Sequence, residues 1–340
     1  MAEITAIEYY LPTSVTTAED LAKEFPEWSA EQIAAKTGIR ECHIAAAGEC
    51  SSDLVATAAN SLFASGAANP TEVDYILFCT QSPDYFLPTS ACLLQSRLGI
   101  PTSAGALDFN LGCSGFIYGL GLAQGLIETR QAACVLLLTG ETYSKFIHPA
   151  DKSVRTIFGD AGAATLVRGG GGSGWGPFVY GTDGAGAENL IVPTGGMREP
   201  RGADAAVEVT DEFGNTRSRA HLFMDGPEIF NFTLNRIPKV VSELLERSGK
   251  KSEDIDLFVF HQANRYMLEH LRKKMRIPPE KFCISMEHCG NTVSSTIPIA
   301  LKTAAAEGKL KAGDTVALVG FGVGYSWGAT LMQWSAEFKG

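Results

Sequence analysis

Five short apolar runs along the chain have the length and the β-branched or aromatic content of buried strands. They span residues 75–79, 106–110, 134–139, 255–260 and 315–319. Stretches with the helical spacing of apolar residues alternate with them, as at 114–129 after the second run. This alternation predicts an α/β fold built in layers and argues against an all-α or all-β fold.

The two halves of the chain resemble each other. VDYILFCTQSPD at 73–84 matches IDLFVFHQAN at 255–264 in type and order, and DAGAATLV at 160–167 matches WGATLMQW at 327–334. We therefore predict a duplicated architecture with a site where the halves meet. The expected boundary is the glycine-rich run 169–176, which gives an N-terminal half, 1–172, and a C-terminal half, 173–340.

Residues 195–219 are polar and charged and show no clear periodicity. They predict an excursion from the core, and the sequence leaves open whether it is a lid or an interface arm. The glycine-rich run 169–176 lacks the Lys-Ser or Lys-Thr that follows the glycines of a phosphate-binding loop, so we read it as a turn.

Composition narrows the class of protein. A chain of 340 residues exceeds the usual size of one domain, and 45% hydrophobic with 19% charged residues is typical of a globular enzyme. No apolar run reaches the length of a membrane span and no signal sequence opens the chain, so we expect a cytoplasmic protein. A net charge of −10 argues against nucleic-acid binding. Cys283, His288 and Cys289 lack the paired spacing of a zinc site, so no metal is expected.

Cys113 is the candidate nucleophile. It lies in DFNLGCSGFIYGL, between a predicted strand and a predicted helix, and Gly112 and Gly115 permit a tight turn around it. At a helix N-terminus, unpaired N–H groups and the helix dipole favour a thiolate over a thiol. The other cysteines lack these neighbours, and we expect them to be structural.

His261 and Asn291 are the candidate partners of Cys113. His261 opens HQAN directly after a predicted buried strand, and Asn291 lies in GNTVSST at 290–296. Taken alone, His261 also suits a core histidine and Asn291 a turn residue. A Cys-His-Asn set occurs in papain-like proteases too, but the residues around Cys113 differ from that signature.

Six motifs in order give the chain a resemblance to the β-ketoacyl-acyl carrier protein synthase III family. They are TGIRECHIA at 37–45, GCSGF at 112–116, FGDAGAA at 158–164, HQAN at 261–264, GNTVSST at 290–296 and GFGVGYSWG at 320–328. The resemblance implies a thiolase fold, a duplicated five-layer αβαβα subunit, in a homodimer. It also implies that Cys113 accepts an acyl group from a thioester.

The resemblance further implies a decarboxylative condensation with a malonyl thioester. His261 Nε2 and the Asn291 amide would then donate hydrogen bonds to the enolate. Phe321 would form an apolar wall near the departing carboxylate. The N–H groups of Cys113 and of the 322–324 loop, Gly322, Val323 and Gly324, would hold the oxyanion.

Substrate and carrier contacts are implied by position alone. The expected substrate-binding residues outside the 320–328 motif are Lys36, Arg40, Lys152, Asn264 and Leu87, and Leu87 is expected to reach a partner subunit. Phe86 and Met224 are further pocket candidates. Gln32 and Lys36 stand where the family has a Trp and an Arg that clamp coenzyme A, and Tyr266 stands where it often has Arg.

Arg272, Lys273 and Lys274 form the candidate docking surface for an acidic acyl carrier protein, although a solvated charged face is an equal reading. No cofactor is expected beyond acyl-coenzyme A or acyl-carrier and malonyl-carrier thioesters as substrates. The lost coenzyme A clamp predicts a preference for carrier-bound donors. Two alternatives stay open: an acyltransferase of the same fold that passes the acyl group to a hydroxyl or amine, and a non-catalytic carrier-binding subunit.

Overall fold

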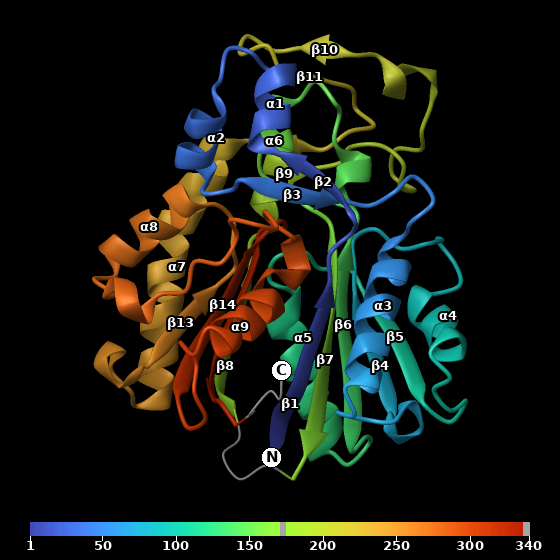
Figure 1. Ribbon diagram of the computed structural model, residues 1–340, viewed down its shortest axis with the longest axis vertical. Coiled ribbons are helices and arrows are strands. Elements are labelled where there is room, and N and C mark those ends of the chain that lie inside the picture. Colours follow the sequence, from blue (N-terminus) through green and yellow to red (C-terminus); the bar gives the residue numbers. More distant parts are fainter. Residues whose placement is uncertain (171–174, 336–340) are drawn as a thin grey trace.

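Two β-sheets form the frame of the protein in a computed structural model that describes residues 1–170 and 175–335 (Figure 1). The first sheet has the strand order β1-β7-β6-β4-β5, and the second β13-β14-β15-β8. Their bounds are β1 Ala2–Tyr10, β4 Tyr75–Cys79, β5 Gly105–Phe109, β6 Cys134–Glu141, β7 Ala161–Gly169, β8 Trp175–Thr182, β13 Leu257–Phe260, β14 Thr315–Gly322 and β15 Ser326–Gln333.

The sheets repeat one pairing pattern, which confirms the predicted duplication. In the first sheet β4 runs parallel to β6, β6 antiparallel to β7, and β7 antiparallel to β1. In the second sheet β13, β14, β15 and β8 follow the same sequence of parallel, antiparallel and antiparallel pairs. The predicted boundary between residues 172 and 173 lies outside the described residues and stays a prediction.

Helices cover both sheets and fill the space between them. A shared apolar core joins Phe116 and Leu301 of two central helices to Leu77 of the first sheet and Val259 of the second. The central helices are α5 Gly115–Glu128 and α9 Thr296–Ala306; α3 Ser51–Ala64 and α4 Ser90–Arg97 cover the outer face of the first sheet, and α7 Gly226–Ser248 and α8 Arg265–Lys274 that of the second (Figure 1). The five predicted αβαβα layers are therefore present.

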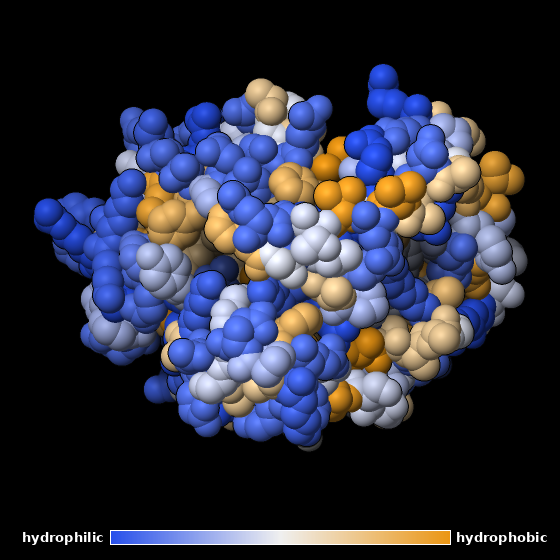
Figure 2. Space-filling model, turned by 90° about the horizontal axis from the view of Figure 1, so that it is seen from above, coloured by the Kyte–Doolittle hydropathy of each residue, from blue (hydrophilic) through white to orange (hydrophobic). Residues whose placement is uncertain are grey.

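The remaining elements gather at the end of the molecule drawn uppermost in Figure 1. They are β2 Ser14–Thr17, α1 Ala18–Glu24, α2 Ala30–Thr37, β3 Glu41–Ile44, α6 Lys152–Arg155, β9 Leu190–Ile191, β10 Val209–Thr210, β11 Thr216–Arg217 and β12 Phe223–Met224. Figure 2 looks down on this end and shows hydrophobic side chains exposed among hydrophilic ones. Across the described residues, no helix is both long and apolar enough to cross a membrane.

The strand predictions hold with small shifts at the ends. The 75–79 run is β4 itself, the 106–110 run is β5 displaced by one residue, and the 255–260 run begins two residues before β13. Residues 195–219 do leave the core, and β10 pairs with β11 there as a short hairpin. Just outside this excursion, β9 pairs with β12, so its two ends meet.

Candidate active site

Cys113 lies in the turn between β5 and α5, one residue before the N-cap Ser114. The turn is tight because the N–H of Gly115 donates to the carbonyl of Gly112, over 2.8 Å. A Cβ at Gly115 would lie 2.2 Å from Cys79 Sγ, so only glycine lets this turn approach β4. The predicted strand, turn and helix around the nucleophile are confirmed.

The loop after β14 closes over Cys113 from the other half of the chain. A Cβ at Gly322 would lie 2.9 Å from Cys113 Sγ, so these residues are in van der Waals contact. The backbone N–H groups of Cys113 and Val323 both act on the thiol and lower its pKa, so two backbone donors lie beside the sulfur. Gly324 has a φ of 134°, a backbone conformation that favours glycine.

His261 follows β13 and is 2% exposed. Its ring meets the Phe321 ring edge-on, with centroids 5.7 Å apart and planes at 87°. Since Phe321 precedes Gly322, the segment that contacts Cys113 also packs against His261. The two halves of the chain therefore bring the predicted nucleophile and histidine to one place.

Asn291 makes the hydrogen bond expected of a turn residue, because its Oδ1 accepts from the N–H of Val293 over 2.9 Å. Its backbone is also fixed, since the Asn291 N–H donates to the carbonyl of Ile157. With Oδ1 occupied, the amide NH2 is the group left to donate to a substrate. The structural and functional readings of Asn291 are thus compatible.

Val293 and Thr296 connect His261 to Asn291. His261 Nδ1 lies 2.8 Å from Thr296 Oγ1, and Thr296 Oγ1 donates to the carbonyl of Val293 over 3.0 Å. Val293 has a φ of 54°, which is strained for a β-branched residue and costs roughly 1–3 kcal/mol. Such strain is concentrated at functional sites.

Burial sets the protonation states of the site. It raises the pKa of the Cys113 thiol to about 12, with a further contribution from the Glu141 carboxyl, and outweighs the two N–H groups. The backbone N–H groups thus favour the thiolate, as expected, but burial outweighs them and Cys113 is a thiol at neutral pH. Burial also lowers the pKa of His261 to about 3, so the ring is neutral at pH 7.

An apolar cluster surrounds Cys113. Its buried members are Tyr143, Ile147, Val154, Phe158, Leu190, Leu222 and Val293, and Met224 packs against them. Met224, one of the pocket candidates from the sequence, therefore packs against the cluster that contains Cys113. Phe86 and Leu87 do not join the cluster in this chain; they are 80% and 82% exposed.

Two of the residues expected to contact a carrier or coenzyme A, Lys36 and Lys152, lie beside Trp28. Lys36 Nζ and Lys152 Nζ lie 5.1 and 5.6 Å from the centre of its ring. Lys152 also forms an ion pair with Glu27, and Arg40 one with Glu287 over 2.9 Å. An aromatic ring thus stands close to the two lysines, although residue 32 is not a tryptophan.

The helix α8 residues differ in their freedom to bind a partner. Arg272 pairs with Glu269 over 2.7 Å, and Lys274 Nζ donates to the carbonyl of Leu234. Lys273 is exposed. Asn264 caps the helix, because its Oδ1 accepts from the N–H of Met267 over 2.8 Å. This is a structural role in addition to the substrate contact expected of Asn264.

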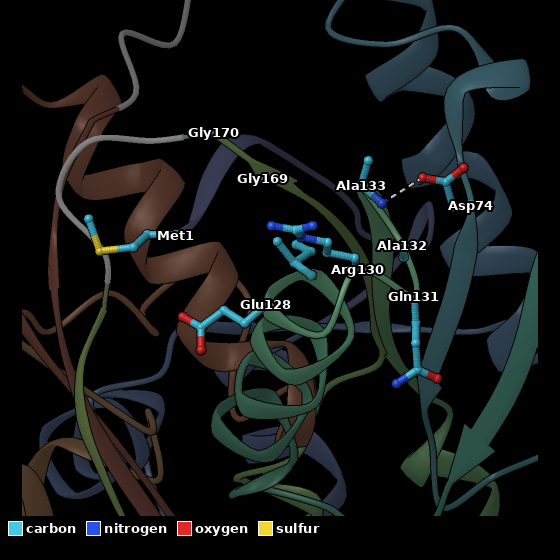
Figure 3. A pocket seen from close by; sticks show the side chains of 10 residues that line it. Met1, Asp74, Glu128, Arg130, Gln131, Ala132, Ala133, Gly169 and Gly170 are labelled. Carbon is cyan, nitrogen blue, oxygen red and sulfur yellow. Dashed lines mark hydrogen bonds between the residues drawn. The ribbon is translucent and has the colours of Figure 1, made fainter.

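A hollow of about 670 Å³ lies at the opposite end of the first sheet (Figure 3). Met1, Asp74, Arg130 and Gly170 line it, together with residues at the end of α5. None of the predicted site residues is among them, so it plays no part in the site around Cys113.

Sequence reasoning missed Glu141, Thr296 and Trp28. Glu141 ends the apolar strand β6 and is fully buried, and a carboxyl at the end of such a run was the available signal. Thr296 is the last residue of GNTVSST, yet nothing in the sequence distinguishes its hydroxyl from those of Ser294 and Ser295. Their roles depend on contacts between distant segments.

The chain is similar throughout its length to proteins of one family. Residues 107–184 match 3-oxoacyl-[acyl-carrier-protein (ACP)] synthase III, and residues 245–334 match the C-terminal part of that family. The beta-ketoacyl-[acyl-carrier-protein] synthase III of Caldanaerobacter subterraneus is 37% identical over 327 residues, 96% of either chain. That of Symbiobacterium thermophilum is 36% identical over 332 residues, 97% of either chain.

Solved structures show the same family likeness. A crystal structure of a 3-oxoacyl-(acyl-carrier-protein) synthase III is 56% identical, covers 98% of this chain and 99% of its own, and superposes with a TM-score of 0.97. The priming β-ketosynthase of the R1128 polyketide pathway is 26% identical over 98% of this chain and 96% of its own, with a TM-score of 0.85. The thiolase fold is confirmed, and the chain belongs to the 3-oxoacyl-[acyl-carrier-protein] synthase III family.

Proposed function

We propose that this condensing enzyme forms a β-ketoacyl thioester in two steps, with Cys113, His261 and Asn291 as its catalytic residues. The observation that carries the proposal is the meeting of both halves of the chain at Cys113, where Gly322 contacts the thiol and Phe321 packs on His261. The sequence alternative of an acyltransferase explains Cys113 equally well, but it gives the Asn291 amide no task.

In the first step Cys113 Sγ forms a bond to the acyl carbon of a thioester, and the bond to the departing carrier sulfur breaks. The thiol proton of Cys113 passes through His261 Nε2 to that leaving sulfur. A proton acceptor is needed because burial raises the pKa of the thiol to about 12. The N–H groups of Cys113 and Val323 stabilise the oxyanion of the tetrahedral intermediate.

In the second step a malonyl thioester loses CO2, and the electron pair of the broken bond passes to an enolate. His261 Nε2 and the Asn291 NH2 donate hydrogen bonds to the enolate oxygen. Phe321, 2% exposed, supports loss of the charged carboxylate as neutral CO2. The enolate carbon attacks the acyl carbon, and Cys113 leaves as a thiolate that regains a proton from water.

The carriers of both thioesters meet the face around Trp28 and α8 in this proposal. Lys36 and Lys152 supply positive charge beside an aromatic ring, which suits the phosphate of a pantetheine arm. Exposed Lys273 suits an acidic acyl carrier protein. We expect acyl-carrier donors to be preferred over the matching coenzyme A esters, and higher kcat/KM with coenzyme A esters would contradict this.

The test is the intact mass of the protein after incubation with a panel of acyl-carrier and acyl-coenzyme A thioesters, followed by malonyl-carrier protein. We expect an acyl adduct that malonyl-carrier protein discharges as a β-ketoacyl product. Cys113→Ala should form no adduct, whereas Cys92→Ala, a change at an exposed cysteine, should behave as the wild type. An adduct discharged only by hydroxyls or amines would establish the acyltransferase instead.

A further inference from the structure

The proposed reaction makes opposite demands on His261 Nε2. During acylation this nitrogen needs a lone pair that can take the Cys113 proton, and during decarboxylation it needs a hydrogen to donate to the enolate. Because the ring is neutral, it carries a single N–H. Serving both steps therefore requires both tautomers, and the group that contacts the other nitrogen, Nδ1, decides which of them is stable.

That group is the hydroxyl of Thr296. Its Oγ1 lies 2.8 Å from His261 Nδ1 and 3.0 Å from the carbonyl oxygen of Val293. Thr296 is 3% exposed and stands at the start of α9, so water does not compete freely for these contacts. The Val293 backbone also acts on the imidazole and opposes the effect of burial on the pKa of His261. Since Thr296 Oγ1 contacts both, this carbonyl lies on the Nδ1 side of the ring.

We propose that Thr296 is a positioning residue whose hydroxyl supports both tautomers of His261, by accepting from Nδ1–H in one and donating to Nδ1 in the other. In the first tautomer Nδ1–H donates to Oγ1, the hydroxyl donates to Val293, and Nε2 has a lone pair. In the second the hydroxyl turns to donate to Nδ1, and Nε2 carries the hydrogen. The number of protons is the same in both. The assignment of Nε2 to the two steps rests on the proposed function.

A hydroxyl is suited to this task because it can donate or accept. A carbonyl or carboxylate at the same place could only accept and would fix the hydrogen on Nδ1. The Val293 carbonyl is such a group, so without the hydroxyl we expect the ring to be held as Nδ1–H. Nε2 would then still accept a proton but could not donate one.

The strained backbone of Val293 fits this arrangement. Its carbonyl accepts from Thr296, and its N–H donates to Asn291 Oδ1, so one residue with a φ of 54° directs both partners of Cys113. Relaxing that φ would turn its peptide groups away from one partner or the other. The strain is thus held where it aligns His261 with the Asn291 amide.

Thr296→Val tests the inference because it removes the hydroxyl and keeps the branched shape. Single-turnover mass measurements separate the two steps: the rate at which Cys113 is acylated, and the rate at which malonyl-carrier protein discharges the acyl enzyme. We expect acylation within about threefold of the wild type and discharge slower by about 100-fold, the typical effect of losing one donor to an oxyanion. Thr296→Ser should restore both steps.

Thr330→Val is the matched control, since Thr330 is also fully buried but lies in β15 and bonds to Gly176 and Leu331. It should leave the ratio of the two rates unchanged. Equal slowing of both steps by Thr296→Val, or no slowing of either, would overturn the inference.

A spectroscopic readout keeps the inference testable if Thr296→Val does not fold or the proposed function fails. With ¹⁵N-labelled histidine, His261 in the wild type should show nitrogen shifts between those of protonated and unprotonated nitrogens, because both tautomers are populated. His261→Gln identifies the signals by their loss. A single fixed tautomer in both the free and the acylated enzyme would refute the role of Thr296. Failure of the proposed function would appear separately, as a wild-type acyl enzyme that malonyl-carrier protein does not discharge.

Discussion

The proposed nucleophile, Cys113, is held as a thiol by the residues around it. Burial and the nearby Glu141 raise the pKa of Cys113, while the N–H groups of Cys113 and Val323 act in the opposite direction. Its nucleophilicity therefore depends on proton transfer during the reaction and not on a standing thiolate. The sequence showed the helix N-terminus that favours a thiolate, but it could not show how completely the second half of the chain buries the sulfur.

Alkylation of Cys113 should be slow at neutral pH and should keep accelerating as pH rises. With a pKa near 12, the thiolate fraction grows tenfold per pH unit from pH 7 to 10. Glu141→Gln should speed the reaction at each pH above about 8, because it removes a neighbouring negative charge; Glu128→Gln, an exposed change, should not. The measurement is the rate at which iodoacetamide alkylates Cys113 at each pH, followed by the mass of the peptide that contains Cys113. A plateau below pH 9 would indicate an ordinary thiolate.

Glu141 should also make the protein less stable as pH rises. Burial raises the pKa of its carboxyl from 4.5 to about 8, although Gln81, Ser294 and Ser82 donate to it. The folded state therefore binds the proton more tightly, and this stabilising effect is lost between pH 4.5 and 8. Between these pH values, urea unfolding of the wild type should show a fall in the free energy of unfolding on the order of a few kcal/mol. Glu141→Gln should not show this fall. Parallel pH curves for the two proteins would contradict the raised pKa.

At the scale of elements, helix α5 has glycines with opposite roles. Gly115 packs its Cα against Cys79, where a Cβ would lie 2.2 Å from Sγ, whereas a Cβ at Gly125 would meet nothing within 4 Å. Gly115→Ala should therefore destabilise the protein by about 1–3 kcal/mol and slow acylation of Cys113. Gly125→Ala should stabilise it by up to about 1 kcal/mol through helix propensity, with acylation unchanged. Thermal unfolding measures the change in stability of each variant, and adduct formation measures its acylation. Equal effects of the two substitutions would show that packing at Gly115 is loose.

Sequence patterns placed the strands well where apolar runs are continuous. β4, β6 and β14 are interior strands and β13 is an edge strand, but all four are buried, and their runs were recognisable because neither face is polar. The excursion at 195–219 had no period to interpret, and its placement depends on contacts such as the ion pair of Arg217 with Asp151, over 2.7 Å. Local sequence does not specify such long-range pairs.

At the scale of the whole molecule, the duplication explains why the site could be predicted in part. Two matching halves place the turn after β5 and the residue after β13 at one junction, so Cys113 and His261 could be paired from sequence. The hydroxyl of Thr296, the carboxyl of Glu141 and the ring of Trp28 act through side-chain contacts between segments far apart in the chain. Those contacts depend on rotamers and packing that a motif does not encode.

The first sheet also ends in a strand that suits a second copy of the chain. β5 is the edge strand, paired within the described residues with β4 alone, and its Leu107 is 40% exposed. Tyr85, Phe86 and Leu87 are exposed after β4, the strand beside it. An unpaired edge next to apolar side chains favours association. The homodimer expected from the family resemblance would cover this face and bring Leu87 toward the partner subunit.

Leu107→Lys should therefore convert a dimer into a monomer, because a two-fold contact through β5 would bring two like charges together. Val209→Lys is the matched control: it places the same charge on an exposed apolar residue of the β10–β11 hairpin and should leave the dimer intact. Sedimentation at micromolar concentration gives the mass of each variant. If Leu87 also contributes to the acyl pocket of the partner, Leu107→Lys will lose acylation of Cys113 together with the dimer. A monomeric wild type, or a Leu107→Lys dimer, would assign the exposed face around β5 another role.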